Sequence, residues 1–186
     1  LIYLKKDKII ISCISTFRPR EDINIYKSWV KRTFLVFFAF LILLITYNYA
    51  TDTYSIFHNK YSQLRREPNQ NFAKVSYILN NKTKYDSFIF GSSRVGKIPP
   101  ENIHNGKYYN FTYSEGLPKE HLQIIKLFIR KGIKIKNILI GLDEFSYRIH
   151  PDTHKHHGFR RIHYLANNDD NIFFFYAFYL FARPSF

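Results

Sequence analysis

Two adjacent serines follow a short apolar run in the middle of the chain. Phe88-Ile89-Phe90 leads directly into Gly91-Ser92-Ser93-Arg94. A serine hydroxyl becomes a nucleophile when a base removes its proton, and histidine is the usual base. Ser93 is therefore a candidate nucleophile, although serines at the end of a strand also commonly satisfy backbone groups in a turn.

Polar residues also follow two later runs of apolar or aromatic residues. Tyr108-Tyr109-Asn110-Phe111 leads toward Gly116, and Ile138-Leu139-Ile140 is followed by Gly141-Leu142-Asp143-Glu144. If these runs are neighbouring parallel strands, their carboxyl ends meet at one edge, where such sheets bind ligands. Arg94 at this edge suits a carboxylate or phosphate group, or alternatively pairs with one of the acidic residues after the last run.

The sequence around these residues predicts the strands and the helix of a partial α/β domain. Short apolar runs bounded by polar residues predict strands at 85–90, 108–111 and 136–142. Residues 118–131 predict a helix, because a proline suits the first turn, apolar residues recur on one face and a glycine follows at the C-terminal cap. Strands that alternate with a helix imply crossover connections and hence a parallel sheet.

The block Phe88-Ile89-Phe90-Gly91-Ser92-Ser93-Arg94-Val95 resembles the first motif of the SGNH, or GDSL-type, hydrolase superfamily. The chain is most similar to membrane-tethered members that are associated with acylation of exported polymers. In that superfamily a strand ends in Gly-Asp-Ser, and the serine is the nucleophile. The resemblance gives this role to Ser93, with Ser92 in place of the aspartate. It covers residues 81–148 and implies the first part of a flavodoxin-like, three-layer α/β/α domain with a parallel sheet.

The resemblance also suggests partners for the serine. The second motif of the superfamily supplies a glycine whose N–H helps to form the oxyanion hole, and Gly116, which follows Asn110, is the best match. The third motif is Gly-x-Asn-x-Asp, and in Gly141-Leu142-Asp143 an aspartate stands at the asparagine position. The catalytic Asp-x-x-His of the superfamily lies near the end of a longer domain, and Asp152-Thr153-His154 has a different spacing. The sequence therefore offers a serine and N–H donors but no visible base.

Histidines cluster after the third predicted strand. They are His150, His154, His156, His157 and His163. Zinc sites use closely spaced histidines, usually with cysteine or carboxylate ligands. Because no cysteine lies near this cluster, we expect a solvated loop, with no metal and no other cofactor. A base for Ser93 from this cluster is the alternative.

An uncharged run near the N-terminus predicts a transmembrane helix. Residues 34–47 carry no charge, and their neighbours extend the run to about the 20 residues that cross a bilayer. The run has no polar stripe, which argues against a buried core helix. The long preceding region argues against a signal peptide. Lys27, Lys31 and Arg32 precede the run, which predicts a cytoplasmic N-terminus.

We therefore expect a single-pass protein of the cell (inner or plasma) membrane whose C-terminal domain is exported. The predicted divisions are a cytoplasmic tail at 1–32, the transmembrane helix at 33–50, a juxtamembrane stalk at 51–80 and the partial SGNH-like domain at 81–186. A short helix is predicted within the stalk at 72–79. The chain starts without methionine and stops after the apolar run 172–182, which is too short to span and predicts the start of a core helix. The sequence thus predicts a fragment.

The charge of the chain is strongly basic. Lys and Arg number 28 against 14 Asp and Glu, a formal charge of +14 at pH 7. Because these residues are spread along the chain, we interpret the charge as a matter of composition and expect no nucleic-acid partner. Attraction to anionic lipid or cell-wall polymer is the alternative. Cys13 is the only cysteine, so no intrachain disulfide can form.

The sequence favours a membrane-anchored serine esterase or acyltransferase that acts on an exported carbohydrate substrate. The alternative is a non-catalytic exported domain that keeps the fold and binds or scaffolds a polymer. A third interpretation is a basic membrane-surface module that binds anionic polymer by charge and does not depend on Ser93.

Overall fold

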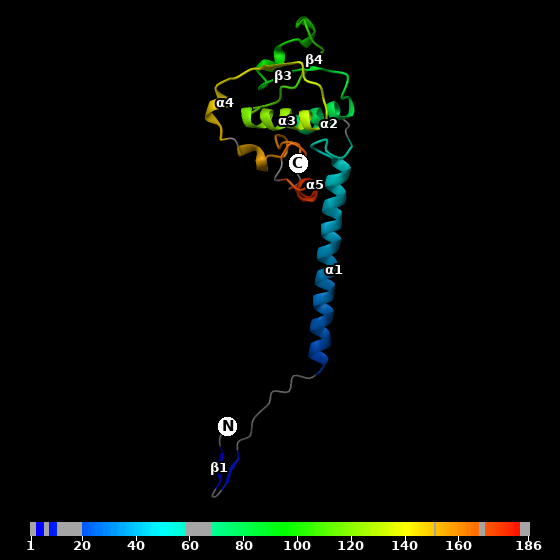
Figure 1. Cartoon of the computed structure of the whole chain (residues 1–186). Coiled ribbons are helices and arrows are strands. Elements are labelled where there is room, and N and C mark those ends of the chain that lie inside the picture. The colour runs from blue at the N-terminus through cyan, green and yellow to red at the C-terminus, as the bar shows by residue number, and fades with distance from the viewer. Residues whose placement is uncertain are drawn as a thin grey trace. The chain divides into compact units, whose positions relative to one another are not determined.

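The computed structural model divides the chain into two compact units, Leu1–Leu43 and Leu44–Phe186. The residues that it describes are 3–5, 8–10, 20–58, 68–150, 152–167 and 170–182. Figure 1 labels α1 to α5 and the strands β1, β3 and β4.

The first unit holds a short hairpin and most of one long helix. Strands β1 (Tyr3–Lys5) and β2 (Lys8–Ile10) pair antiparallel. Helix α1 runs over Arg20–Thr51, so that its last two turns belong to the second unit. The segment 33–50, in which the sequence predicts the transmembrane helix, lies entirely within α1.

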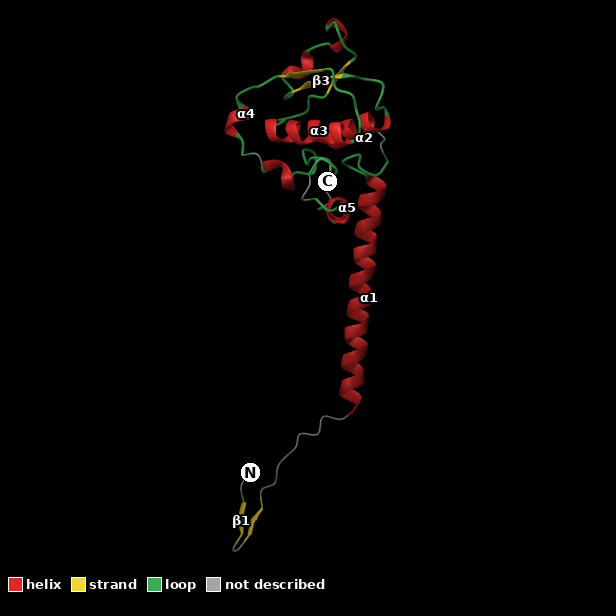
Figure 2. Ribbon diagram, in the orientation of Figure 1, coloured by secondary structure: helices red, strands yellow, loops and turns green. Residues whose placement is uncertain are grey.

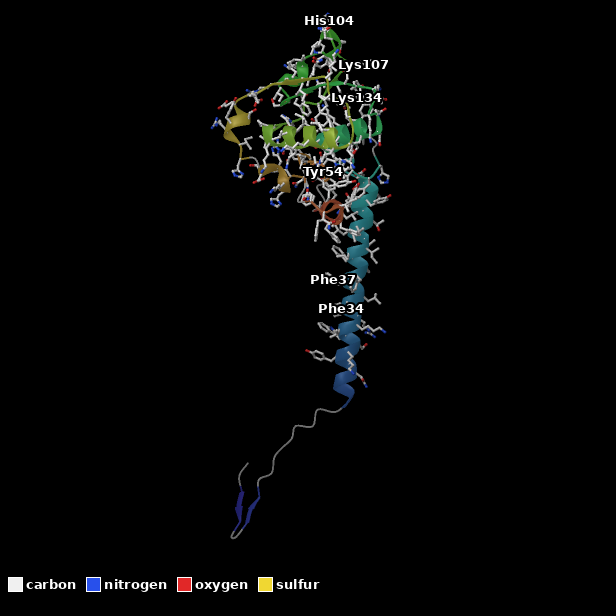
Figure 3. All side chains as sticks on the ribbon, viewed as in Figure 1. Phe34, Phe37, Tyr54, His104, Lys107 and Lys134 are labelled. Atoms are coloured by element: carbon white, nitrogen blue, oxygen red, sulfur yellow. The ribbon has the colours of Figure 1, made fainter. Side chains whose placement is uncertain are left out.

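In the described part of the chain, α1 is the one helix with the length and composition of a membrane span. Its residues Asn24–Thr51 are long and apolar enough to cross a bilayer. Core helices and signal sequences pass the same test of length and composition, but no residue of the apolar window is buried. Phe34 and Phe37 project outward from the helix and are each 59% exposed (Figure 3).

A three-stranded parallel sheet organises the second unit. Its order is β4 (Tyr108–Asn110), β3 (Ser87–Phe90) and β5 (Asn137–Ile140), with both pairs parallel and the first residues of the three strands in register. Helix α3 (Pro118–Arg130) forms the crossover from β4 to β5. The α/β class and the parallel sheet that the sequence predicts are confirmed, while the complete SGNH-type fold with three layers stays a prediction.

The main core lies between this sheet and two helices. Helix α2 (Gln70–Asn80) buries Val75 and Ile78 in the same cluster as Phe88 and Phe90 of β3 and Phe128 of α3. Figure 2 shows α2 and α3 on the same side of the sheet. The predicted short helix in the stalk is therefore part of the α/β unit, which begins before the boundary that the sequence places at residue 81.

A second, smaller cluster lies beside the end of α1. It consists of Ile56, Phe72, Phe175 and Tyr179, all of them buried. The last two belong to helix α5 (Ile172–Leu180), which falls in the apolar run where the sequence predicts the start of a core helix. Only one face of α5 is buried, so the prediction of a core helix is correct for that face alone.

Short helices lie in the connections before β4 and after β5. The 3-10 helices η1 (Val95–Lys97) and η2 (Pro100–Asn102) lie between β3 and β4. After β5 come α4 (Phe145–Arg148) and η3 (Thr153–His156).

Candidate functional site

Two glycines allow the ends of β3 and β5 to approach each other. Gly91 has φ +154°, a conformation that side chains rarely adopt, and a Cβ there would lie 2.9 Å from Val95 Cβ. A Cβ on Gly141 would lie 2.1 Å from Val95 Cγ2. The Val95 side chain therefore occupies the space that both glycines leave open, and it closes the turn after β3 over the end of β5.

Ser92 connects the same two strand ends by a hydrogen bond. Its buried hydroxyl donates to Asp143 Oδ2, and Asp143 also accepts hydrogen bonds from the backbone and side chain of Ser146. Partial burial raises the pKa of Asp143, but the bonds from Ser92 and Ser146 and the charge of Arg94 outweigh it. The pKa of Asp143 therefore lies below its ordinary value. Asp143 is an ionised acceptor that fixes the turn before Ser93.

Arg94 interacts electrostatically with Asp143 at the carboxyl edge of the sheet. Its charge lowers the pKa of Asp143, which agrees with the predicted interaction between the two residues. Glu144, the other predicted partner, forms an ion pair with Arg148 of α4. Arg94 is exposed, so its guanidinium remains accessible from solvent.

Ser93 lies next in the chain and is exposed. In the ranges that the structure describes, no hydrogen bond joins its hydroxyl to a histidine or a carboxylate. The fold thus presents Ser93 at the carboxyl edge of a parallel sheet, shortly after a buried strand.

Gly116 and Asn110 make contacts within the protein. A Cβ on Gly116 would lie 2.7 Å from the Gly91 carbonyl oxygen, so the predicted oxyanion glycine does lie against the turn after β3. Its N–H donates to the Tyr113 carbonyl at 3.2 Å. The Asn110 side chain donates to the Gly96 carbonyl at 2.9 Å and accepts from Thr112. Asn110 therefore fixes the loop between β3 and β4.

A buried glutamate network that was not predicted from the sequence lies at the start of α3. Glu120 Oε2 accepts a hydrogen bond from the Tyr113 hydroxyl at 2.8 Å, and Glu120 Oε1 lies 2.9 Å from His154 Nδ1. Glu115 pairs with Arg160 at 2.6 Å. Burial raises the pKa of Tyr113 well above its ordinary range, and the Glu120 charge adds to this shift. A glutamate three residues after a helix start is a capping signal in the sequence, but its histidine partner is not local.

A half-buried lysine is a further polar group that was not evident from the sequence. Lys74 of α2 donates to the carbonyl of Asn110, at 3.1 Å, and to that of Thr112. Burial lowers the pKa of Lys74 to about 8. Lys74 therefore anchors α2 to the carboxyl end of β4.

The histidines after β5 lie in different environments. His156 and His157 are exposed, as a solvated loop predicts, but His154 and His163 are buried. The solvated-loop prediction is therefore wrong for these two residues. Within the described residues, no group of three or more histidine, cysteine, aspartate and glutamate side chains is arranged to hold a metal ion.

Comparison of the chain with protein-family models, with characterised proteins and with solved structures gives no match. The class of the protein is thus defined by its structure alone, as an α/β unit with a parallel sheet and an exposed serine at the carboxyl edge of that sheet. Membership of the SGNH superfamily stays a prediction from the motifs.

Proposed function

We propose that this chain contains an SGNH-like serine esterase or acyltransferase unit, held at the membrane by α1 and acting on ester groups of an exported carbohydrate. The observation that carries the proposal is the exposure of Ser93 at the carboxyl edge of the sheet. The Ser92–Asp143 hydrogen bond and Gly91 fix the turn that presents this hydroxyl.

The proposed chemistry transfers an acyl group through Ser93. The Ser93 oxygen attacks the acyl carbon, its proton passes to a base, and the ester C–O bond breaks while the leaving alcohol takes up a proton. Water or an acceptor hydroxyl then removes the acyl group from Ser93. The backbone N–H of Ser93 suits the developing oxyanion. The N–H of Gly116 would first have to leave the Tyr113 carbonyl.

The proposed location follows from the charges beside α1. Lys27, Lys31 and Arg32 precede the apolar part of the helix, and basic residues collect on the cytoplasmic side of a membrane. The unit that carries Ser93 would then lie on the exported side, where an acylated polymer is the substrate class within reach.

Labelling of the full-length protein in membranes with a fluorophosphonate probe tests the proposal. Such probes phosphonylate an activated serine, so we expect labelling that Ser93→Ala abolishes. Ser114→Ala is the matched control in the neighbouring loop and should leave labelling unchanged. Labelling that survives Ser93→Ala would show that another residue reacts, and the assignment of Ser93 would be wrong.

A non-catalytic binding domain is the second candidate function. It is favoured by the lack, within the described ranges, of a histidine bonded to Ser93. This candidate predicts no labelling of the folded protein and binding of the exported polymer that Ser93→Ala does not change.

A further inference from the structure

Helix α5 has a buried face and an exposed face, and both are apolar. Its nine residues are Ile-Phe-Phe-Phe-Tyr-Ala-Phe-Tyr-Leu, with no charged side chain. Phe175 and Tyr179 are buried, whereas Phe173 is 82% and Phe174 is 72% exposed. Ile172 and Phe181, at the two ends of the helix, are about half exposed. We call these four exposed residues the α5 patch. Exposed apolar side chains that gather on one short helix mark a candidate interaction surface.

The end of α1 binds α5 directly. Asn48 donates its side-chain amide to the carbonyl of Leu180 at 2.7 Å and to that of Ala182 at 3.0 Å. Leu180 is the last residue of α5 and Ala182 follows the helix, so Asn48 binds its C-terminal end, where carbonyls have no partner within the helix. The bonds join residues of the same compact unit, and Figure 1 shows α5 beside the end of α1.

Aromatic rings reinforce this junction. The rings of Tyr49 and Phe57 are 5.3 Å apart, and those of Phe57 and Tyr176 are 5.8 Å apart. α5 is therefore held to the last turns of α1 by both hydrogen bonds and ring packing.

The last turns of α1 mark the level of the membrane surface if α1 spans. Tyr47 and Tyr49 lie near the end of its uncharged run, which Asp52 follows, and are 45% and 49% exposed. Tyrosines at the end of a membrane span prefer the headgroup region. Asn48 lies between them, so its hydrogen bonds hold α5 at the same level.

We propose that α5 is a second membrane contact, in which the α5 patch inserts into the boundary between headgroups and acyl chains of the leaflet where α1 ends. A bilayer fits this surface better than a protein partner does, because the patch is uncharged and lies on a helix that is hydrogen-bonded to the end of a candidate membrane span. With nine residues, α5 is too short to cross a bilayer. The strength of interfacial binding increases with the apolar area that a helix buries in the lipid. The inference rests on α1 being inserted and does not depend on the chemistry of Ser93.

The test places a tryptophan in the patch of the full-length protein. Trp29→Phe removes the only native tryptophan, and Phe174→Trp then reports on α5. The protein is reconstituted in phosphatidylcholine vesicles that contain lipids brominated at different depths. Because an interfacial helix lies about 5–10 Å into the headgroup–acyl boundary, shallow bromines should quench the emission more strongly than bromines near the chain ends.

Tyr147→Trp in the same background is the matched control. Tyr147 is 78% exposed on α4, so its replacement should emit at longer wavelength and should not be quenched. Equal quenching curves for Phe174→Trp and Tyr147→Trp would show that α5 faces water. An emission at short wavelength without quenching would show that protein covers the patch. Either result overturns the proposal.

The original chain supplies the test of the anchor. Trp29 lies near the start of the apolar part of α1 and should be quenched by brominated lipid. If Trp29 is not quenched, α1 is not inserted, and the proposal for α5 fails with it.

Discussion

Asn69 joins three segments of the second unit through one buried side chain. Its Oδ1 accepts the N–H of Phe72 at 2.9 Å, which caps α2. Its Nδ2 donates to the Arg161 carbonyl at 2.8 Å and to the Tyr179 hydroxyl at 2.9 Å. Asn69 thereby links α2, the segment after η3 and α5.

We expect Asn69→Ala to destabilise the protein by at least about 2 kcal/mol, since it removes a helix cap and leaves buried polar partners unsatisfied. Asn80→Ala is the matched control, because Asn80 is the exposed last residue of the same helix. Thermal unfolding of the full-length protein, followed by near-UV circular dichroism, measures both. Equal melting temperatures for the two variants would refute the role of Asn69.

At the scale of elements, the closure of β3 over β5 depends on two glycines and one valine. We expect Gly141→Ala to lower the free energy of unfolding by about 1–3 kcal/mol, because the added methyl overlaps Val95 Cγ2. Val95→Ala in the same chain should recover part of this loss, since it removes the overlapping atoms. A Gly141→Ala/Val95→Ala protein less stable than the sum of the two single changes would contradict this packing.

Gly91→Ala supplies the contrast to this double variant. A Cβ there also meets Val95, but the backbone itself has φ +154°. We therefore expect Val95→Ala to recover little of the stability that Gly91→Ala removes. Chemical unfolding of Gly91→Ala, Val95→Ala and the double variant would measure this. Full recovery would mean that side-chain overlap, and not backbone strain, requires the glycine.

The same elements show how far the sequence could predict the fold. The predicted strands at 85–90, 108–111 and 136–142 each contain an observed strand, because short apolar runs that end at polar or small residues are local signals. The packing of α2 against β3 was missed, since it depends on tertiary contacts of Val75 and Ile78 that the stalk-like composition hides.

For the site, the sequence predicted which residues lie near one another but not the hydrogen bonds between their side chains. Parallel pairing explains why Ser93, Asp143 and Gly116 were correctly expected near one edge of the sheet. The bond from Ser92 to Asp143 joins residues 51 positions apart, and that from His154 to Glu120 joins residues 34 positions apart. Such pairs follow from the packed fold and leave no periodic signal in the sequence.

At the scale of the whole molecule, two buried histidines couple folding to pH. Burial lowers the pKa of His121 and that of His163 to about 4. His163 is stacked on Phe72, with ring centroids 4.8 Å apart, and its Nδ1 accepts the N–H of Leu165 at 3.1 Å. This acceptor role requires an unprotonated Nδ1, so the folded state holds the neutral ring.

The free energy of unfolding should therefore fall as the pH falls from about 6.5, the pKa of a histidine in an unfolded chain, toward 4. In this window the unfolded chain binds protons that the folded chain does not, so acid favours unfolding, by at most about 3 kcal/mol for each histidine. His163→Asn keeps an acceptor for the Leu165 N–H but does not titrate, and it should flatten the pH dependence. His156→Asn, at an exposed position, should leave the dependence unchanged. Denaturant unfolding of the three proteins between pH 4.5 and 7 measures these slopes, and a His163→Asn protein as acid-sensitive as the original would show that His163 is already protonated in the folded state.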